Sequence, residues 1–480
     1  MITMLGSPRR CCDGITRRET LKAGALSLLG GYFNLPSLLA AEAARDPGAK
    51  PGKAKSVILL YLLGGAATQD MFDLKPEAPS GVRSEFKPIP TSAPGVRICE
   101  HLPGTAAWMH RAALVRSVNH KAGCHNCLPS YTGHDQPMPD QHPRDTDPPS
   151  MGSVCEWLNR RQAADSLPDY VYMPCWLGWG QVFRRAGPYG GFLGHRFDAL
   201  TTECQPYADK GLKPGPGKPA VIRGEPVLPA SVLGVDLTVD RIDRRRGLLQ
   251  QLDDQVRRAE AGPEVASYSR TQQRAFGILT SSRLRAAFDL SREDPRVLER
   301  YGRTLFGHSS VIARRLVEEG VRFVNVTWDL FWDRVQVDYD AWDTHTQNFS
   351  ILRDNKLPHF DQTYAALMAD LDARGLLDET LVVVMSEMGR TPRINGNAGR
   401  DHWTYCYSVM LAGAGIRGGT VCGASDAQAA YVKDRPVSPA EVCATIYQCL
   451  GIDPQLPVCD RGGRPSPIAR GADAIREILA

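Results

Sequence analysis

The sequence lacks any long run of charges of one sign. Its 480 residues include 57 Lys and Arg against 53 Asp and Glu, which gives a formal net charge of +4. Proteins that bind nucleic acid through its phosphates gather Lys and Arg into a patch or stripe, and no segment of this chain does so. We therefore expect no nucleic acid partner.

An uninterrupted apolar stretch long enough to cross a membrane is also missing. The N-terminal segment "TRRETLKAGALSLLGGYFNLPSLLAAEAA" is moderately apolar, but glycines, an asparagine and a proline interrupt it, whereas a span needs about 20 apolar residues. A membrane anchor is the alternative interpretation. The pair Arg17 and Arg18 and the terminal "AEA" predict instead a twin-arginine signal at 1–43, cleaved after Ala43. We expect a periplasmic or extracellular protein with no stable membrane span.

A second Cys-x-x-Cys pair at the spacing of a zinc finger is absent as well. The motif "CHNC" at Cys124 and Cys127 stands alone, which argues against a structural zinc finger. Of 13 cysteines, Cys11 and Cys12 fall in the predicted signal. The odd number that remains predicts pairing in an oxidising compartment with at least one free thiol.

Apolar runs typical of buried strands recur along the chain. The run at 56–63 is apolar on both faces and ends in two glycines, and further runs cover 112–119, 321–328, 379–387 and 407–413. Helical patterns lie between them, and this alternation favours a mainly parallel sheet. We predict a linker at 44–55 and one α/β domain at 56–480, with a central sheet flanked by helices and a variable insertion at about 135–240.

Several helices are expected from hydrophobic spacing and capping residues. They cover 153–162, 241–262, 268–286, 294–320, 351–374 and a final segment with Ser438 as its N-cap.

Chemically reactive side chains follow four of these strands, in the segments 70–73, 120–134, 329–345 and 387–402. In parallel α/β sheets, ligands bind at the C-terminal ends of the strands, so these segments should meet. Zinc and hard divalent cations prefer imidazole nitrogens and carboxylate oxygens. The candidate donors are Asp343, His345, Glu387, Asp401 and His402.

Each donor also has a structural interpretation. Asp343 can cap the helix that follows, and Asp401 can pair with a neighbouring arginine. His345 and His402 can be hydrogen-bonded structural histidines. We predict the metal role because "GRDHW" can bring His402 opposite Asp343 and His345, and a tetrahedral site with an open position needs three ligands.

Longer motifs run from about residue 57 to the C-terminus. They include "GGAATQDMFDLKPEAP", "WDTHTQNF" and "LDETLVVVMSEMGRTPRINGNAGRDHW", and together they resemble the exported bacterial family known as domain of unknown function 1501. That family is similar in fold to the alkaline phosphatase and sulfatase superfamily, which implies an alkaline-phosphatase-like core. Its members usually begin with a twin-arginine signal, and no settled reaction comes with the name.

The resemblance implies metal ligands at particular positions. Asp343, His345 and His402 resemble the ligands of one superfamily metal, and Asp70 and Glu387 resemble those of a second. The superfamily usually has an Asp-His pair where this chain has "SEMG", so Glu387 stands without a following histidine.

A nucleophile is implied by the same resemblance. "CLPSYTGH" resembles the sulfatase signature C-x-P-S-R, but Tyr131 occupies the position of the arginine, and we expect no formylglycine at Cys127. The thiolate of Cys127 and the hydroxyl of Ser130 are the candidate nucleophiles, although Cys127 can equally be buried or disulfide-bonded. Arg390 or Arg393 is the candidate for neutralising the developing anion.

Together these observations predict an exported hydrolase of sulfate or phosphate esters that uses a divalent metal, zinc, manganese or calcium. Its substrate would be a small-molecule or polysaccharide ester. The alternative is a catalytically silent exported binding protein that keeps the fold for polysaccharide or surface recognition. The two differ in whether a metal with an open position lies beside a nucleophile.

Overall fold

The computed structural model describes residues 53–135, 137, 141–159, 167–208, 221–228, 281–329, 331 and 342–480. The chain divides into two units, Met1–Lys50 and Pro51–Ala480, and all the described residues belong to the second. The predicted signal at 1–43, most of the linker, the helix expected at 241–262 and most of the helix expected at 268–286 lie outside the described residues. Within those residues, no helix combines the length and apolarity needed to cross a membrane.

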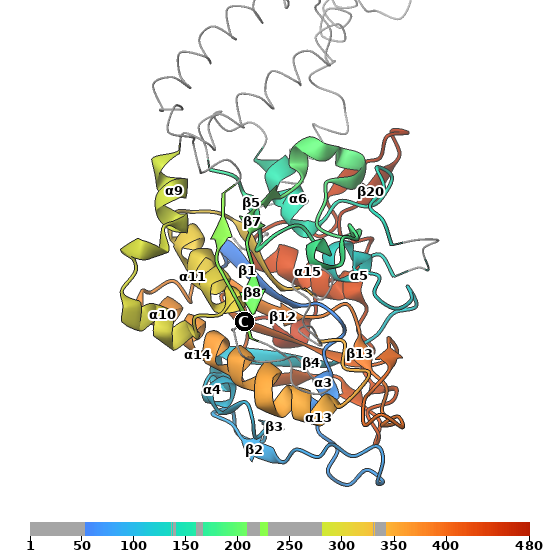
Figure 1. Cartoon of the computed structure of the whole chain (residues 1–480). Coiled ribbons are helices and arrows are strands. Elements are labelled where there is room, and N and C mark those ends of the chain that lie inside the picture. The colour runs from blue at the N-terminus through green and yellow to red at the C-terminus, as the bar shows by residue number, and fades with distance from the viewer. Residues whose placement is uncertain are drawn as a thin grey trace, which may run out of the picture. The chain divides into compact units, whose positions relative to one another are not determined.

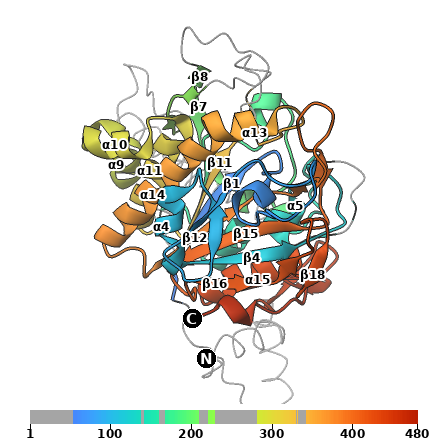
Figure 2. The same cartoon turned by 90° about the horizontal axis from the view of Figure 1, so that it is seen from below.

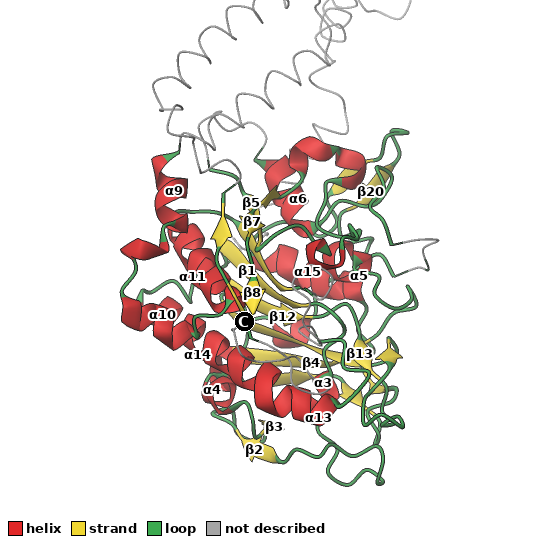
Figure 3. Ribbon diagram, in the orientation of Figure 1, coloured by secondary structure: helices red, strands yellow, loops and turns green. Residues whose placement is uncertain are grey.

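An eight-stranded sheet forms the centre of this unit (Figure 3). Its strands in spatial order are β16 (Thr420–Cys422), β4 (Ala112–Val118), β15 (Tyr407–Gly413), β12 (Thr380–Met385), β1 (Ser56–Leu62), β11 (Phe323–Trp328), β5 (Tyr170–Met173) and β6 (Leu200–Thr201). All neighbouring pairs are parallel except those that β15 makes with β12 and β4. The predicted mainly parallel sheet is confirmed.

Strand β1 explains why both faces of the sheet are covered. Ile58, Leu60 and Leu62 belong to the apolar core on one face, whereas Val57 and Leu59 belong to the core on the other, and each is at most 1% exposed. Successive side chains of a strand point to opposite faces. A strand without polar alternation therefore requires helices on both sides.

Helices supply these two layers, as Figures 1 and 2 show. One layer, with the short α3 (Thr68–Met71), contains α4 (Pro103–Ala107), α9 (Ser282–Phe288), α10 (Pro295–Tyr301), α11 (Leu305–Glu318), α13 (Asn348–Ile351) and α14 (Leu357–Ala373). The other contains α5 (Leu128–Thr132), α6 (Met151–Leu158) and α15 (Pro439–Cys449).

Small elements complete the described part of the chain. Two-stranded ribbons are formed by β2 (Pro88–Pro90) with β3 (Arg97–Cys99), β7 (Glu203–Cys204) with β10 (Pro226–Val227), β8 (Tyr207–Ala208) with β9 (Ile222–Arg223), β13 (Gly389–Arg390) with β14 (His402–Trp403), β17 (Ala424–Ser425) with β18 (Val432–Asp434), and β19 (Pro457–Cys459) with β20 (Pro465–Pro467). Short 3₁₀ helices cover Met109–Arg111, Trp179–Gln181, Gly191–Leu193, His195–Phe197, Leu290–Arg292 and Arg476–Ile478.

Most expected helices are present, with shifted ends. The one at 294–320 is two helices, α10 and α11, because Gly302 adopts φ 98° and ends the first. The one at 351–374 begins earlier, at Asn348, and includes a π-helical turn, Leu352–Lys356. Ser438 caps α15 as predicted: its hydroxyl accepts the amide of Glu441 at 3.2 Å, and the Glu441 side chain accepts the Ser438 amide at 2.8 Å.

One boundary expectation needs correction. Strands β5 and β6 lie within 135–240, the segment expected to be a variable insertion, yet both belong to the central sheet. Residues 170–173 form only a four-residue strand that is followed at once by Pro174. So short a run among Gly, Pro and aromatic residues gives no period from which a strand can be recognised.

Candidate metal centre

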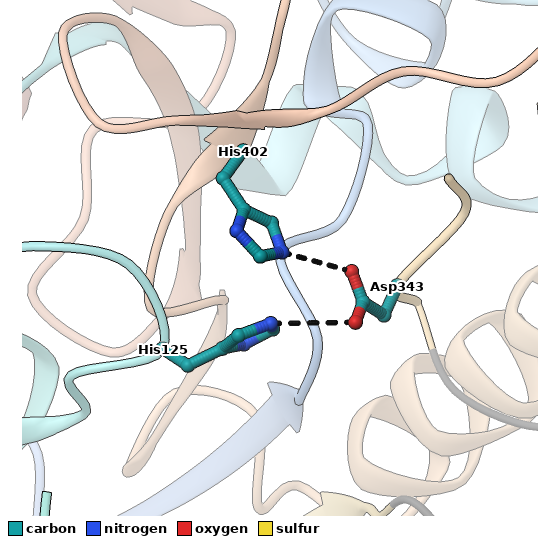
Figure 4. A group of neighbouring side chains, drawn as sticks. All are labelled: His125, Asp343 and His402. Atoms are coloured by element: carbon teal, nitrogen blue, oxygen red, sulfur yellow. Dashed lines mark hydrogen bonds and ion pairs between the residues drawn. The ribbon is translucent and has the colours of Figure 1, made fainter.

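Three histidines surround one aspartate beyond the C-terminal ends of the strands. Figure 4 shows His125 and His402 pointing at Asp343 from different segments. His125 lies between β4 and α5, Asp343 lies between β11 and α13, and His402 begins β14. His345, two residues after Asp343, completes the group. The structure thus brings Asp343, His345 and His402 together and adds His125.

Each imidazole directs the same ring nitrogen, Nε2, at the carboxylate. Asp343 Oδ2 lies 3.3 Å from Nε2 of His125, and Asp343 Oδ1 lies 3.1 Å from that of His345 and 3.2 Å from that of His402. The Nε2 atoms of His345 and His402 are 2.9 Å apart. Ligands on tetrahedral zinc, with bonds of about 2.0–2.1 Å, lie about 3.3 Å from one another. His125, Asp343 and His402 each offer one donor atom within 4.8 Å of the others, so these three are close enough to share one ion.

Two of the histidines have a second carboxylate behind the ring. Nδ1 of His125 lies 2.9 Å from Glu387 Oε1, and Nδ1 of His345 lies 2.8 Å from Asp401 Oδ1. A carboxylate at Nδ1 holds the proton on that nitrogen and leaves the Nε2 lone pair facing inward, which is the arrangement of metal-binding histidines.

Glu387 is fixed by the turn that follows β1. Its carboxylate is fully buried and accepts the Gly64 amide at 2.9 Å and the Ser386 hydroxyl at 3.1 Å. Gly64 has φ 117°, and a Cβ there would lie 2.7 Å from the backbone nitrogen of Asp343. Only glycine therefore lets this turn reach both Glu387 and the Asp343 segment.

Arg390 lies inside the cluster. Its guanidinium is fully buried, donates to the carbonyls of Gly65 at 2.7 Å and Arg400 at 3.0 Å, and also contacts the Gly64 carbonyl and Asp343 Oδ1. Most of its five N–H groups are taken by these acceptors. The structure thus places Arg390 where it orients Asp343.

Asp70 and Glu387, which the resemblance assigned to a second metal, have different partners. Both oxygens of Asp70 accept from Arg400, at 2.8 and 2.9 Å, and Asn348 donates to Oδ2 at 2.9 Å. Asp70 and Arg400 are both at most 1% exposed. Among the described residues, no hydrogen bond or ion pair links Asp70 with Glu387 or with the histidines.

The candidate nucleophiles are buried. Cys127 is 1% exposed, and burial raises the pKa of its thiol far above the ordinary value. Ser130 is 3% exposed and donates to the Ser386 carbonyl at 3.2 Å. Cys124 and Cys127 are both free thiols. For Cys127 the structure therefore shows the buried alternative, without the disulfide.

Burial and hydrogen bonding oppose each other at the histidines. Burial lowers the pKa of His125, but hydrogen bonds to Asp343 and Glu387 outweigh it, so the pKa is raised. At His402 burial prevails over the Asp343 contact and the pKa is lowered. Burial likewise opposes ionisation of Asp343, yet its hydrogen bonds to three histidines hold its pKa well below the ordinary value.

The directly contacting charges do not balance when the imidazoles are neutral. Asp343, Glu387 and Asp401 are each held ionised by these contacts, since the pKa of each is lowered. The guanidinium of Arg390 offsets one of the three negative charges. Protonation of His125 and His345, whose pKa values the hydrogen bonds to these carboxylates raise, would balance the remaining two, and so would a divalent cation. The 38% and 25% exposed side chains of His345 and His402 leave the cluster accessible to solvent.

The sequence interpretation missed His125 as a donor. It was treated only as part of the cysteine motif "CHNC", although it lies in a loop that follows a strand, as the other donors do. Its backbone has φ 53°, and its carbonyl accepts from Arg185 at 3.3 Å. A left-handed non-glycine residue is uncommon and cannot be recognised from spacing.

Comparison with protein families identifies the chain. The family described as protein of unknown function, DUF1501, matches residues 54–479. The chain belongs to this family. Among curated proteins, no sequence matches this DUF1501 chain.

Solved structures align with the DUF1501 chain at low identity. They include the lipoteichoic acid synthase LtaP from Listeria monocytogenes (10% identical, covering 88% of this chain and 78% of that one, TM-score 0.33). The PsFucS1 sulfatase from Pseudoalteromonas sp. is 12% identical (87% and 72% covered, TM-score 0.35), and BT4656, solved with D-glucosamine-2-N,6-O-disulfate, is 11% identical (89% and 82% covered, TM-score 0.34). Similarity of this extent assigns no activity and no substrate.

Proposed function

We propose that this DUF1501 protein is an exported, metal-dependent hydrolase of sulfate or phosphate esters. The observation that supports the proposal is the convergence of three Nε2 nitrogens on Asp343, with Glu387 and Asp401 placed behind two of the rings. Three segments that lie far apart in the sequence, after β4, β11 and β12, contribute these groups. A purely structural histidine needs only one partner.

The donor set fits a divalent transition metal. His125, Asp343 and His402 each offer one donor atom within 4.8 Å of the others, and His345 lies beside them. Imidazole-rich sets suit zinc, whereas carboxylate, carbonyl and water oxygens suit manganese and calcium, and calcium is bound by oxygen ligands throughout. Of the three expected ions, calcium fits least well.

The chain's own groups have defined roles in this proposal. When bound, a divalent cation polarises an ester oxygen and activates water for attack. Glu387 orients His125 and Asp401 orients His345, while Arg390 holds Asp343. Because Cys127 and Ser130 are buried, direct hydrolysis by water is favoured over a covalent intermediate on either side chain.

The binding protein remains a second candidate, and the same burial favours it. Neither Cys127 nor Ser130 is exposed to a ligand, and the guanidinium of Arg390 is enclosed. A protein that keeps the cluster only to hold an ion, or to recognise a polysaccharide at the surface, requires none of these groups to be free.

Metal analysis combined with ester assays tests the proposal. Purified chain reconstituted with zinc or manganese should retain about one ion and cleave an aryl phosphate or aryl sulfate, and His402→Ala should lose both the ion and the activity. His195→Ala is the matched control, because that imidazole is 80% exposed and distant in sequence from the cluster. Retention of metal by His402→Ala would contradict the site. Metal without hydrolysis of either ester would favour the binding protein.

A further inference from the structure

Three aromatic rings form an exposed cluster beside the candidate centre. We call Trp403, Tyr405 and Tyr431 the aromatic triad. Their ring centroids lie 4.9, 5.4 and 5.8 Å apart, so that each ring touches the other two. Tyr405 is 51% exposed and Tyr431 is 54% exposed.

Such exposure is uncommon in the described part of the chain. Among the described residues, six large apolar side chains are exposed. Tyr405 and Tyr431 are the two of these six whose rings contact each other. Single exposed apolar residues need no explanation, whereas a contiguous aromatic patch indicates a binding surface.

The triad is held rigidly. Asp426 accepts the backbone amides of Gln428 at 3.0 Å, Ala430 at 2.8 Å and Tyr431 at 3.2 Å, which fixes the loop between β17 and β18. The Trp403 indole donates to the carbonyl of Ala430 at 2.5 Å and ties β14 to this loop. A surface fixed before a ligand arrives loses little conformational entropy on binding.

The triad is continuous with the candidate centre but separate from it. Trp403 follows His402 on β14, and successive side chains of a strand point to opposite faces. The His402 ring faces Asp343, so the triad lies on the other face of the β13–β14 ribbon. A ligand on the triad therefore lies next to the metal cluster without occupying it.

The charges near the triad argue against an anionic ligand. Segments 401–405 and 426–434 contain three aspartates and one lysine, whereas phosphate-rich polymers require a surplus of Arg and Lys. The pyranose ring of a sugar has an apolar C–H face and hydroxyl groups at its rim. It therefore matches the side chains of tyrosine and tryptophan, which have apolar faces and polar tips.

We propose that the aromatic triad is a binding platform for neutral pyranose units of an oligosaccharide or polysaccharide. The platform depends on neither the metal nor the hydrolysis proposed above.

Calorimetric titration of the full chain with uncharged hexasaccharides tests this proposal. The probes are cellohexaose, xylohexaose, mannohexaose and maltohexaose, with a heparin hexasaccharide and a proline-rich peptide as competitors of other classes. The test variants are Tyr405→Ala and Tyr431→Ala, singly and together. Tyr207→Ala is the matched control, because Tyr207 is 56% exposed and is not part of the triad. Trp403 stays unchanged because its indole holds the loop.

We expect at least one neutral hexasaccharide to bind wild type and Tyr207→Ala equally. The affinity of the double alanine variant for this hexasaccharide should be lower by a factor of about ten or more, as expected when aromatic rings that contact a ligand are removed. The Tyr405→Phe and Tyr431→Phe variants keep the rings and should retain most of the affinity. Circular dichroism identifies any variant that fails to fold, and the single variants Tyr405→Ala and Tyr431→Ala then carry the test.

Three results would overturn the platform. The first is no binding of any neutral hexasaccharide to the wild type, and the second is undiminished binding to the double alanine variant. The third is preferential binding of heparin or of the peptide, which would assign the triad to a polyanion or to a protein partner.

Discussion

Replacing Glu387 with glutamine tests whether the carboxylates behind the histidines act on a metal. Oε1 of Glu387 accepts from Nδ1 of His125 and from the Gly64 amide, both at 2.9 Å, and Oε2 accepts from Ser386 at 3.1 Å. The carbonyl oxygen of glutamine keeps the first two contacts, whereas its amide group loses the Ser386 contact, because the Ser386 oxygen already accepts the amides of Gly65 and Ala66. The substitution therefore removes the charge and preserves the shape.

The expected effect falls on metal affinity. Without the negative charge, the Nδ1 hydrogen bond weakens and Nε2 of His125 becomes a poorer donor. Substitutions behind a ligating histidine lower metal affinity about 10- to 100-fold, or about 1.4 to 2.7 kcal/mol. Glu387 is fully buried, so solvent does not screen the loss, and we expect a value near the upper end.

Zinc competition with a chromogenic chelator at neutral pH measures this effect. Asp401→Asn makes the matched comparison at His345, and its effect should be smaller because the Asp401 side chain is 53% exposed. Far-ultraviolet circular dichroism and thermal unfolding of the metal-free proteins should be close to wild type for both variants. Equal zinc affinity in Glu387→Gln and wild type would refute the reasoning, and a larger loss in Asp401→Asn would refute the role of burial.

Three further predictions concern other parts of the fold. Asp70→Ala leaves Arg400 buried without its carboxylate partner and should lower the free energy of unfolding by about 3–5 kcal/mol. Zinc stoichiometry should stay unchanged, and loss of zinc would instead support Asp70 as a ligand. Ser438→Ala removes the α15 cap and should cost about 1 kcal/mol in urea unfolding; an unchanged midpoint would argue against the cap. A thiol reagent should label the exposed Cys124 and Cys459 in native protein before any buried cysteine, and mass spectrometry after brief alkylation would reveal the opposite order.

The central strands could be predicted because their sequences are apolar on both faces. β1 and β12 show this pattern, whereas β11 is apolar on one face and has Asn325 and Thr327 on the other; the glycines or polar residues that follow place the C-terminal ends of these strands. The direction of β15 could not be predicted, because an equally apolar strand fits a sheet in either direction and its pairing decides the outcome. β5 is four residues long, too short to show a period.

The meeting of Asp343, His345 and His402 could be expected from the rule that post-strand loops converge. The hydrogen-bond partners of the acidic residues could not be predicted from the sequence. Which carboxylate receives a buried guanidinium depends on how the loops pack, and the structure gives Arg400 to Asp70 and Arg390 to Asp343. His125 reaches the cluster only through a left-handed backbone conformation.

The wide spacing of the converging loops along the chain also sets an order of events. His125, Asp343 and His402 can meet only after β4, β11 and β12 have taken their places in the sheet, and non-local parallel pairing is a slow step of folding. An ion that needs all three donors therefore binds the finished fold alone, and at a concentration 100 times its Kd it adds about 2.7 kcal/mol to stability. Twin-arginine export, predicted for this chain, carries proteins that are already folded. On that route the proposed metal would be acquired in the cytoplasm, and the composition of that compartment would decide which ion the exported protein holds.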